Sequence, residues 1–367
     1  MPPPLPRIET VKLRTGASMP LVGLGTAHLY RDAGRAAIAD ALDAGYRHVD
    51  CAKVYGNESL VGDELARAIA GEPSGADAPG VAPRASARGA RAPIPRSELF
   101  VVSKLWNDDH APGDVAAACR RSLRNLRLEY LDLYLIHWPL DWRKGTVLCP
   151  GRTPLIETWR AMEKLVDEGL ARAIGVSNFD EAQLRDLARD ARIQPAVNQV
   201  ELHPFCQQPE LVTACEAMGV AVTAWSPLGK GARALMENPV LERLAAGDGA
   251  PASSSSSSSS GGTARRGPAD VALRWNTQRG VAVIPKSTSG AHLRANLRAG
   301  DGSWALSREG MAAVAGLDAG KRRVPDLLGV WPATANPAAI AAGWVVRNIA
   351  RAVFAVVPNR VDLMAPQ

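Results

Sequence analysis

The chain has 367 residues, of which 46% are hydrophobic, enough for one large domain or two smaller domains with a sizeable core. Its formal charge of +6 comes from 43 basic and 37 acidic residues. The basic residues are spread along the chain, which argues against nucleic-acid binding because such proteins cluster them. The five cysteines are odd in number and lack zinc-ligand spacing, so we expect reduced thiols and no metal site.

The ends of the chain carry no clear membrane signal. The N-terminal sequence MPPPLPRIETVKL has no basic region followed by an apolar stretch, so we expect a cytoplasmic protein without a signal peptide. The apolar segment 338–357 contains Arg347, Asn348 and Arg351, which makes it a poor transmembrane candidate. We expect a monomer or weak dimer.

Short apolar segments alternate with segments of helical periodicity along most of the chain, which is the pattern of a parallel sheet built from βα units. The predicted strands are residues 21–26, 48–52, 100–105, 131–137, 171–177, 196–201, 221–226 and 281–286. The predicted helices include residues 33–44, 114–126, 158–168 and 181–189. Eight such units close a barrel, so we predict an α/β protein with the (β/α)8 TIM barrel fold.

Four segments stand outside this repeat. Residues 11–25 predict a hairpin around Thr15 and Gly16 that caps the floor of the barrel. Residues 71–96 have almost no large apolar side chains and residues 251–262 contain eight consecutive serines, so both are predicted to be disordered loop insertions. We assign residues 1–323 to one barrel domain and residues 324–367 to a tail.

The tail has apolar residues on one face of a predicted helix, with Arg347 and Arg351 opposite. The apolar residues are Ile340, Trp344, Val345, Ile349, Val353 and Val356. This pattern predicts a helix packed on the barrel or on a partner protein, and a membrane-surface helix is the alternative.

Polar and aromatic residues follow the predicted strands at their carboxyl ends, where the loops of a barrel gather around the active site. Asp50 lies near the end of the second strand, and Tyr55 follows it in the next loop. Lys104 and His137 end the third and fourth strands. The later strand ends carry Ser177, Asn178, Gln199, Trp225 and Lys286. We therefore expect all of these side chains to meet on one rim of the barrel.

The first four of these residues make chemical sense as one unit. A phenol has a pKa of about 10 and is a poor acid at neutral pH. The ammonium of Lys104 favours the phenolate and makes the proton of Tyr55 easier to lose, while Asp50 keeps Lys104 charged. Tyr55 is then a general acid toward a carbonyl oxygen, to which a neutral His137 also donates. Taken singly, each residue has a structural explanation, such as packing or an ion pair.

Two other motifs resemble a dinucleotide-binding site and a metal site only in part. Gly23, Leu24 and Gly25 begin like a GxGxxG motif, but His28 stands in the place of the third glycine, so we predict no Rossmann site. Residues 107–110 (NDDH) have no partner cluster, so we predict a solvated turn there and no metal.

An anion site is expected late in the barrel. Residues 226–229 (SPLG) and 286–288 (KST) place hydroxyls, backbone amides and a cation where barrel enzymes bind phosphate.

Several motifs in chain order resemble the aldo-keto reductase family. They are GLGTAH, VDCAKVYGNE, VVSKLW, YLDLYLIHWP, AIGVSNF, AVNQVELHP, AWSPLG and VIPKS, within residues 11–318. Together they are highly specific, although each alone is weak. By this resemblance, Asp50, Tyr55, Lys104 and His137 match the catalytic tetrad of the family. The resemblance implies a small-molecule carbonyl substrate and NADPH or NADP+ as cofactor, with NADH use left open.

The resemblance also implies which residues bind the ligands. Ser177, Asn178 and Gln199 match the residues that hold the carboxamide of the nicotinamide, and Trp225 matches the one that stacks on its ring. The expected cofactor-binding residues are Thr26, Ser177, Asn178, Gln199, Trp225, Ser226, Leu228, Lys286, Ser287, Thr288, His292 and Asn296, and the expected substrate-binding residues are Trp106 and Trp138.

The chain departs from the family at the cofactor end. Where many members carry an Arg that binds the 2′-phosphate, this chain has His292, with Arg294 two residues further on. Ala295 replaces a Glu that touches adenine, and Ala27 replaces a Trp of the substrate pocket. The preference for NADPH is therefore expected to rest on Lys286 with help from His292 or Arg294.

Two functions remain open. The first is reduction of an aldehyde or ketone, including an aldose or a sugar phosphate. Arg143 and Lys144, in the short 140–154 loop beside His137, would meet a phosphate or carboxylate unless they belong to a solvated loop. The second is a nucleotide-binding regulatory or sensor subunit with little turnover, which the tail motivates.

Overall fold

The structure, a computed structural model, describes residues 5–75, 92–146, 149–247 and 266–322. The predicted insertion 251–262, the tail 324–367 and most of the insertion 71–96 lie outside these ranges. No helix within the described ranges combines the length and the apolar character that a membrane crossing requires.

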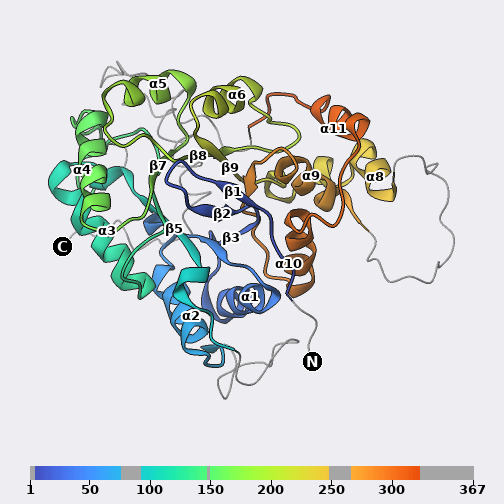
Figure 1. The fold of residues 1–367 in the computed structure, drawn as a ribbon, viewed down its shortest axis with the longest axis horizontal. Coiled ribbons are helices and arrows are strands. Elements are labelled where there is room, and N and C mark those ends of the chain that lie inside the picture. The colour runs from blue at the N-terminus through green and yellow to red at the C-terminus, as the bar shows by residue number, and fades with distance from the viewer. Residues whose placement is uncertain (1–4, 76–91, 147–148, 248–265, 323–367) are drawn as a thin grey trace.

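Eight parallel strands form a closed barrel, which confirms the predicted fold (Figure 1). They are β3 (Gly23–Gly25), β4 (His48–Asp50), β5 (Phe100–Leu105), β6 (Leu133–Ile136), β7 (Ile174–Ser177), β8 (Val197–Glu201), β9 (Ala221–Trp225) and β10 (Ala282–Val283). Each strand pairs with the next in chain order. The barrel closes where Val22 bridges to Val283 and the Val283 N–H donates to the Leu21 carbonyl at 2.7 Å.

Helices surround this barrel, as Figure 1 shows. They are α1 (Arg31–Ala44), α2 (Glu58–Ala70), α3 (Pro112–Leu126), α4 (Leu155–Asp167), α5 (Glu181–Asp190), α6 (Pro209–Ala217), α7 (Arg233–Met236), α8 (Pro239–Ala246), α9 (Pro268–Thr277), α10 (Gly290–Leu297) and α11 (Arg308–Ala315). The predicted helices correspond to α1, α3, α4 and α5. Local sequence explains their starts: Pro112 opens α3, and Asp180 and Gln183 form a capping box at α5.

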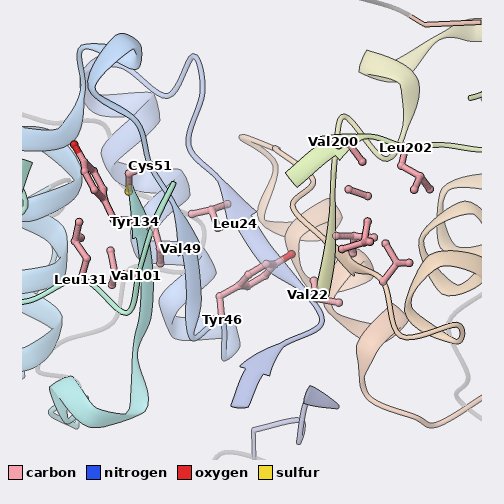
Figure 2. Packing of buried hydrophobic residues seen from close by; sticks show 14 of the residues in the cluster. Val22, Leu24, Tyr46, Val49, Cys51, Val101, Leu131, Tyr134, Val200 and Leu202 are labelled. Carbon is pink, nitrogen blue, oxygen red and sulfur yellow. The ribbon is translucent and has the colours of Figure 1, made fainter. Parts of the chain in front are cut away.

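The pleat of each strand sends alternate side chains to two different cores. On β5, Val101 and Leu105 belong to the outer core between strands and helices, part of which Figure 2 shows. Phe100 and Val102 belong to a second core inside the barrel. Lys104 comes two residues after Val102, so it also faces the interior.

A hairpin closes the amino-terminal end of the barrel, as predicted. Strands β1 (Thr10–Lys12) and β2 (Ser18–Pro20) pair antiparallel. Leu13 and Met19 join the inner core together with Phe100 and Leu133, which begin β5 and β6. Because this end is filled with apolar side chains, the carboxyl ends of the strands are left for a site.

Candidate active site

The register of the strands brings polar side chains together above the inner core. Asp50 pairs with Val102, and Lys104 pairs with Leu135 on β6, and both apolar partners face inside. His137 follows Leu135 by two residues and therefore points the same way. The interior side chains of β5 and β6 thus change from apolar to polar toward the carboxyl end of the barrel.

Lys104 is the centre of the resulting cluster. Its side chain is fully buried, and Nζ donates to Asp50 Oδ2 at 2.7 Å, to the Cys51 carbonyl at 2.9 Å and to the Tyr55 hydroxyl at 3.3 Å. The second carboxylate oxygen of Asp50 accepts from Gln199 Nε2 at 2.8 Å. Tyr55 comes from the short helix η1 (Lys53–Tyr55). The ammonium therefore touches both its counter-ion and the phenol.

Burial and charge act in opposite directions on this cluster. Burial raises the pKa of Tyr55 and Lys104 lowers it, and the net result is a pKa of about 12. Lys104 thus favours the phenolate, as expected from the sequence, but desolvation outweighs the ammonium in the free protein. Burial lowers the pKa of Lys104, but Asp50 and Tyr55 raise it above its ordinary value. Burial and then Lys104 hold the pKa of His137 well below its usual range, which keeps this imidazole neutral.

A cavity of about 680 Å³ opens above the cluster, within the volume range of small-molecule and cofactor sites. Asp50, Tyr55 and His137 form part of its wall, and Trp138 lies beside them. Lys104 lies behind this wall. The phenol and the imidazole are thus the polar groups that this end of the cavity offers to a ligand, with Lys104 supporting them from below.

Comparison with known proteins identifies the family. Residues 21–319 match the model of the Aldo/keto reductase family. The chain belongs to this family. It is 41% identical to mouse aldo-keto reductase family 1 member A1 over 310 residues, 80% of this chain and 85% of the relative. The human protein of the same name is 40% identical over 337 residues, 87% of this chain and 92% of the relative.

Solved structures give the same result. An aldose reductase from Schistosoma japonicum superimposes with a TM-score of 0.71 at 34% identity, covering 86% of this chain and 94% of that one. The Bombyx mori aldo-keto reductase in complex with NADP superimposes with a TM-score of 0.72 at 32% identity, covering 87% of this chain and 95% of that one.

Most of the residues expected to hold the cofactor line the cavity of this aldo/keto reductase. They are Asn178, Gln199, Trp225, Ser226, Leu228, Lys286, Ser287, His292 and Asn296. Asn178 is fixed from three sides: its amide donates to the His137 carbonyl at 2.9 Å and to Ser177 Oγ at 3.1 Å, and its oxygen accepts from Trp225 Nε1 at 2.9 Å. The Trp225 ring is therefore held in place on the cavity wall.

Four expected ligand contacts lie outside the cavity lining: Thr26, Ser177, Thr288 and Trp106. Thr26 Oγ1 donates to the Asp50 carbonyl at 2.8 Å, and Ser177 Oγ donates to the Gln199 carbonyl at 2.7 Å. The Trp106 ring packs edge-on against His137 with the centroids 5.0 Å apart. In this structure these three residues support wall residues from behind.

Four further residues that the sequence does not predict also form the cavity. Met236 from α7, Ala269 and Asp270 from α9, and Lys230 from the loop after β9 also line it. None of them follows a strand directly, so the rule of polar strand ends does not find them. The glycines on either side of Lys230 are the only local signal.

The prediction of a solvated turn at residues 107–110 is wrong. Asn107, Asp109 and His110 are buried. Asp109 forms ion pairs with Lys53, Arg121 and Lys144. Distant cations make this burial possible, and no local pattern reveals them. Across the described ranges, no three His, Cys, Asp or Glu side chains gather as a metal would require.

Proposed function

We propose that this aldo/keto reductase uses NADP(H) to reduce an aldehyde or ketone to the alcohol, with Tyr55 as proton donor. One observation carries the proposal: the Tyr55 hydroxyl lies on the cavity wall, 3.3 Å from the ammonium of the buried Lys104. Lys104 is in turn paired with Asp50 at 2.7 Å. A phenol supported by a fixed cation at the edge of a ligand cavity is suited to proton transfer.

Tyr55 gives its proton to the carbonyl oxygen as negative charge develops there. The raised pKa of the free phenol fits a group that stays protonated until that moment, and Lys104 then stabilises the phenolate that remains. His137 stays neutral and donates to the same oxygen, which orients the carbonyl. Asp50 and Gln199 keep Lys104 in place through the two ends of the Asp50 carboxylate.

The cavity wall fits a phosphorylated nicotinamide dinucleotide. The Trp225 ring, held by Asn178, provides a stacking surface in the same cavity as Tyr55, and Lys286 and Ser287 face the cavity just before the N-terminus of α10, a position that favours anions. His292 lines the cavity whereas Arg294 does not, so we assign the second side chain of the 2′-phosphate site to His292. When bound, NADPH supplies the hydride. The Bombyx mori neighbour, a complex with NADP, supports this assignment.

The substrate class is proposed as a plain aldehyde, including an aldose. The Schistosoma japonicum neighbour is named an aldose reductase, which supports testing aldoses. Lys144, one of the two cations behind the sugar-phosphate hypothesis, is already paired with Asp109 and Asp114. A sugar phosphate would therefore have to rely on Arg143 alone.

The test is NADPH consumption by the full chain on a panel of aldehydes, ketones and aldoses, alongside NADPH binding followed by tryptophan fluorescence. We expect turnover on at least one class of carbonyl. Tight NADPH binding without turnover on any of them would instead favour the nucleotide-binding sensor subunit. Equal KM changes for phosphorylated and plain aldoses in Arg143→Ala would remove the sugar-phosphate hypothesis.

A further inference from the structure

The turn η4 (Asn107–Asp109) contains a buried carboxylate that forms ion pairs with basic side chains from three separate segments. The Asp109 side chain is 0% exposed. Its Oδ2 accepts from Lys53 Nζ at 2.7 Å and from an Arg121 guanidinium nitrogen at 2.7 Å, and its Oδ1 accepts from Lys144. Asp108 adds a second contact to Lys53 at 2.6 Å.

Two of these cations come from segments that adjoin residues of the cavity wall in the sequence. Lys53 opens η1, the single turn that ends with Tyr55. Lys144 lies in the segment that follows His137. Arg121 comes from α3 and anchors the carboxylate to the outer ring of helices. The turn that ends with Tyr55 and the segment beyond His137 are therefore both tied to the Asp109 carboxylate.

A chain of aromatic contacts continues from Lys144 toward His137. The backbone N–H of Trp142 donates to the Asn107 carbonyl at 2.8 Å. Its ring packs edge-on against Trp106 at 5.5 Å, and Trp106 packs edge-on against His137 at 5.0 Å. The segment that Lys144 ties to Asp109 thus builds the support behind His137.

Asp109 carries its charge in this environment. Burial raises the pKa of its carboxyl, but the contacts with Lys144, Lys53 and Arg121 lower it, and the net direction is downward. An ionised carboxylate without exposure needs its cations, because an uncompensated buried charge is strongly unfavourable. The three contacts therefore form together and restrain the two loops jointly.

We propose that Asp109 is a positioning residue for the reduction, acting on Tyr55 through Lys53 and on the wall behind His137 through Lys144. This inference rests on the proposed function, since it assigns the two lysines separate kinetic roles. Lys53 holds the turn that carries the proton donor, so its loss should lower kcat. Lys144 holds the segment that supports the wall behind His137, so its loss should raise KM for a bulky substrate.

The experiment compares Lys53→Met and Lys144→Met in the full chain, since both side chains are more exposed than Asp109 and tolerate substitution better. We expect Lys53→Met to lower kcat on the order of tenfold with KM unchanged, because small misplacements of a reacting group are costly. Lys144→Met should raise KM for bulky aromatic aldehydes and leave it unchanged for small ones. Asp109→Asn should show both effects, and Lys53→Arg should restore kcat because it keeps the charge.

Arg120→Met is the matched control. Arg120 lies next to Arg121 on α3 and forms an exposed ion pair with Glu168 at 2.6 Å, away from the cavity. Its loss should leave kcat and KM at wild-type values. If Lys53→Met and Lys144→Met follow Arg120→Met in kcat and KM and only lower the denaturation midpoint, the network is structural and the proposal is overturned.

A second readout separates this inference from the proposed function. Acrylamide quenching of the Trp142 contribution to fluorescence, obtained by difference from Trp142→Phe, reports whether its 3% exposed ring becomes accessible. We expect greater quenching in Lys144→Met than in Arg120→Met. Unchanged quenching would overturn the role of Lys144, and this result needs no turnover. Failure of the proposed function would appear instead as an inactive wild-type protein.

Discussion

The two ends of the cavity are built differently. At the end that contains Tyr55, which the proposed function makes the catalytic end, Lys104 is fully buried and donates to three partners, and Asp50 accepts from both Lys104 and Gln199. At the outer end, Lys286 and His292 are exposed side chains, one in the loop after β10 and one in the first turn of α10. Both ends are polar, but Lys104 and Asp50 are buried in a hydrogen-bonded cluster, whereas Lys286 and His292 are exposed.

This difference shows that the side chains of the catalytic end are already ordered in the folded protein before a ligand binds. Fixed donors aimed at a reacting oxygen need no reorganisation during the reaction, so the catalytic end is suited to chemistry. Exposed side chains keep their mobility until a charged ligand orders them, so the outer end is suited to binding. Substitutions at the catalytic end should therefore have large effects, and those at the outer end small ones.

The largest effect is expected for Tyr55→Phe, which removes the proton donor and keeps the ring. The kcat of carbonyl reduction should fall by about 10² to 10⁴, the usual contribution of a general acid. Tyr130→Phe is the control, because Tyr130 lies between Arg96 and Arg172 outside the cavity. Steady-state NADPH oxidation measures both. A Tyr55→Phe enzyme as active as Tyr130→Phe would contradict the role of Tyr55.

The same contrast predicts a stability effect at Lys104. Lys104→Met leaves the Asp50 carboxylate, which is 1% exposed, without its cation. Breaking a buried pair in this way costs about 3–5 kcal/mol of the free energy of unfolding. Urea denaturation measures the loss, and adding Asp50→Asn should recover much of it, because the unpaired charge is then gone. Equal stability of the single and double variants would show that the pair does not act as a unit.

The fold and the meeting of these side chains at one end of the barrel were predictable because local patterns determine them. Alternation along β5 and β6 assigns Lys104 and His137 to the barrel interior, and closure of eight parallel strands brings their ends together. The hairpin follows from turn residues at Thr15 and Gly16. These features need no knowledge of distant contacts beyond the barrel itself.

The remaining features depend on contacts that no local pattern contains. Asp109 is buried only because Lys53, Arg121 and Lys144 reach it from other elements. The direction of the Tyr55 pKa shift depends on how completely the site excludes water, which is a property of the whole barrel. The same holds for Asp270, which reaches the cavity from a helix that no motif marks.

The dry surroundings of the catalytic end extend to His110, and they predict acid sensitivity. Burial lowers the pKa of His110 from 6.5 to about 4. The unfolded chain therefore binds a proton that the folded protein refuses between these pH values, so stability is lost as pH falls from 6.5 to 4. The loss should be about 3 kcal/mol.

Denaturation midpoints at several pH values check this sign. In His110→Asn the fall in stability over the same range should be shallower by about one proton. His48 is also buried and has a lowered pKa, and it is present in both proteins. The difference between the two pH dependences therefore reports His110 alone. An unchanged slope would mean that His110 is not the group that titrates.

The smallest effect is expected at the outer end, from Lys286→Met. An exposed ion pair contributes at most about 1 kcal/mol, so the affinity for NADPH should fall roughly fivefold. The affinity for NADH should change less, because it lacks the 2′-phosphate, and raised salt should narrow the difference. Titration of tryptophan fluorescence measures both, with Arg294→Met as the matched control, since Arg294 lies on α10 but outside the cavity lining. Equal losses for both nucleotides would assign Lys286 to the pyrophosphate, and a loss far above fivefold would show that the outer end is as ordered as the catalytic one.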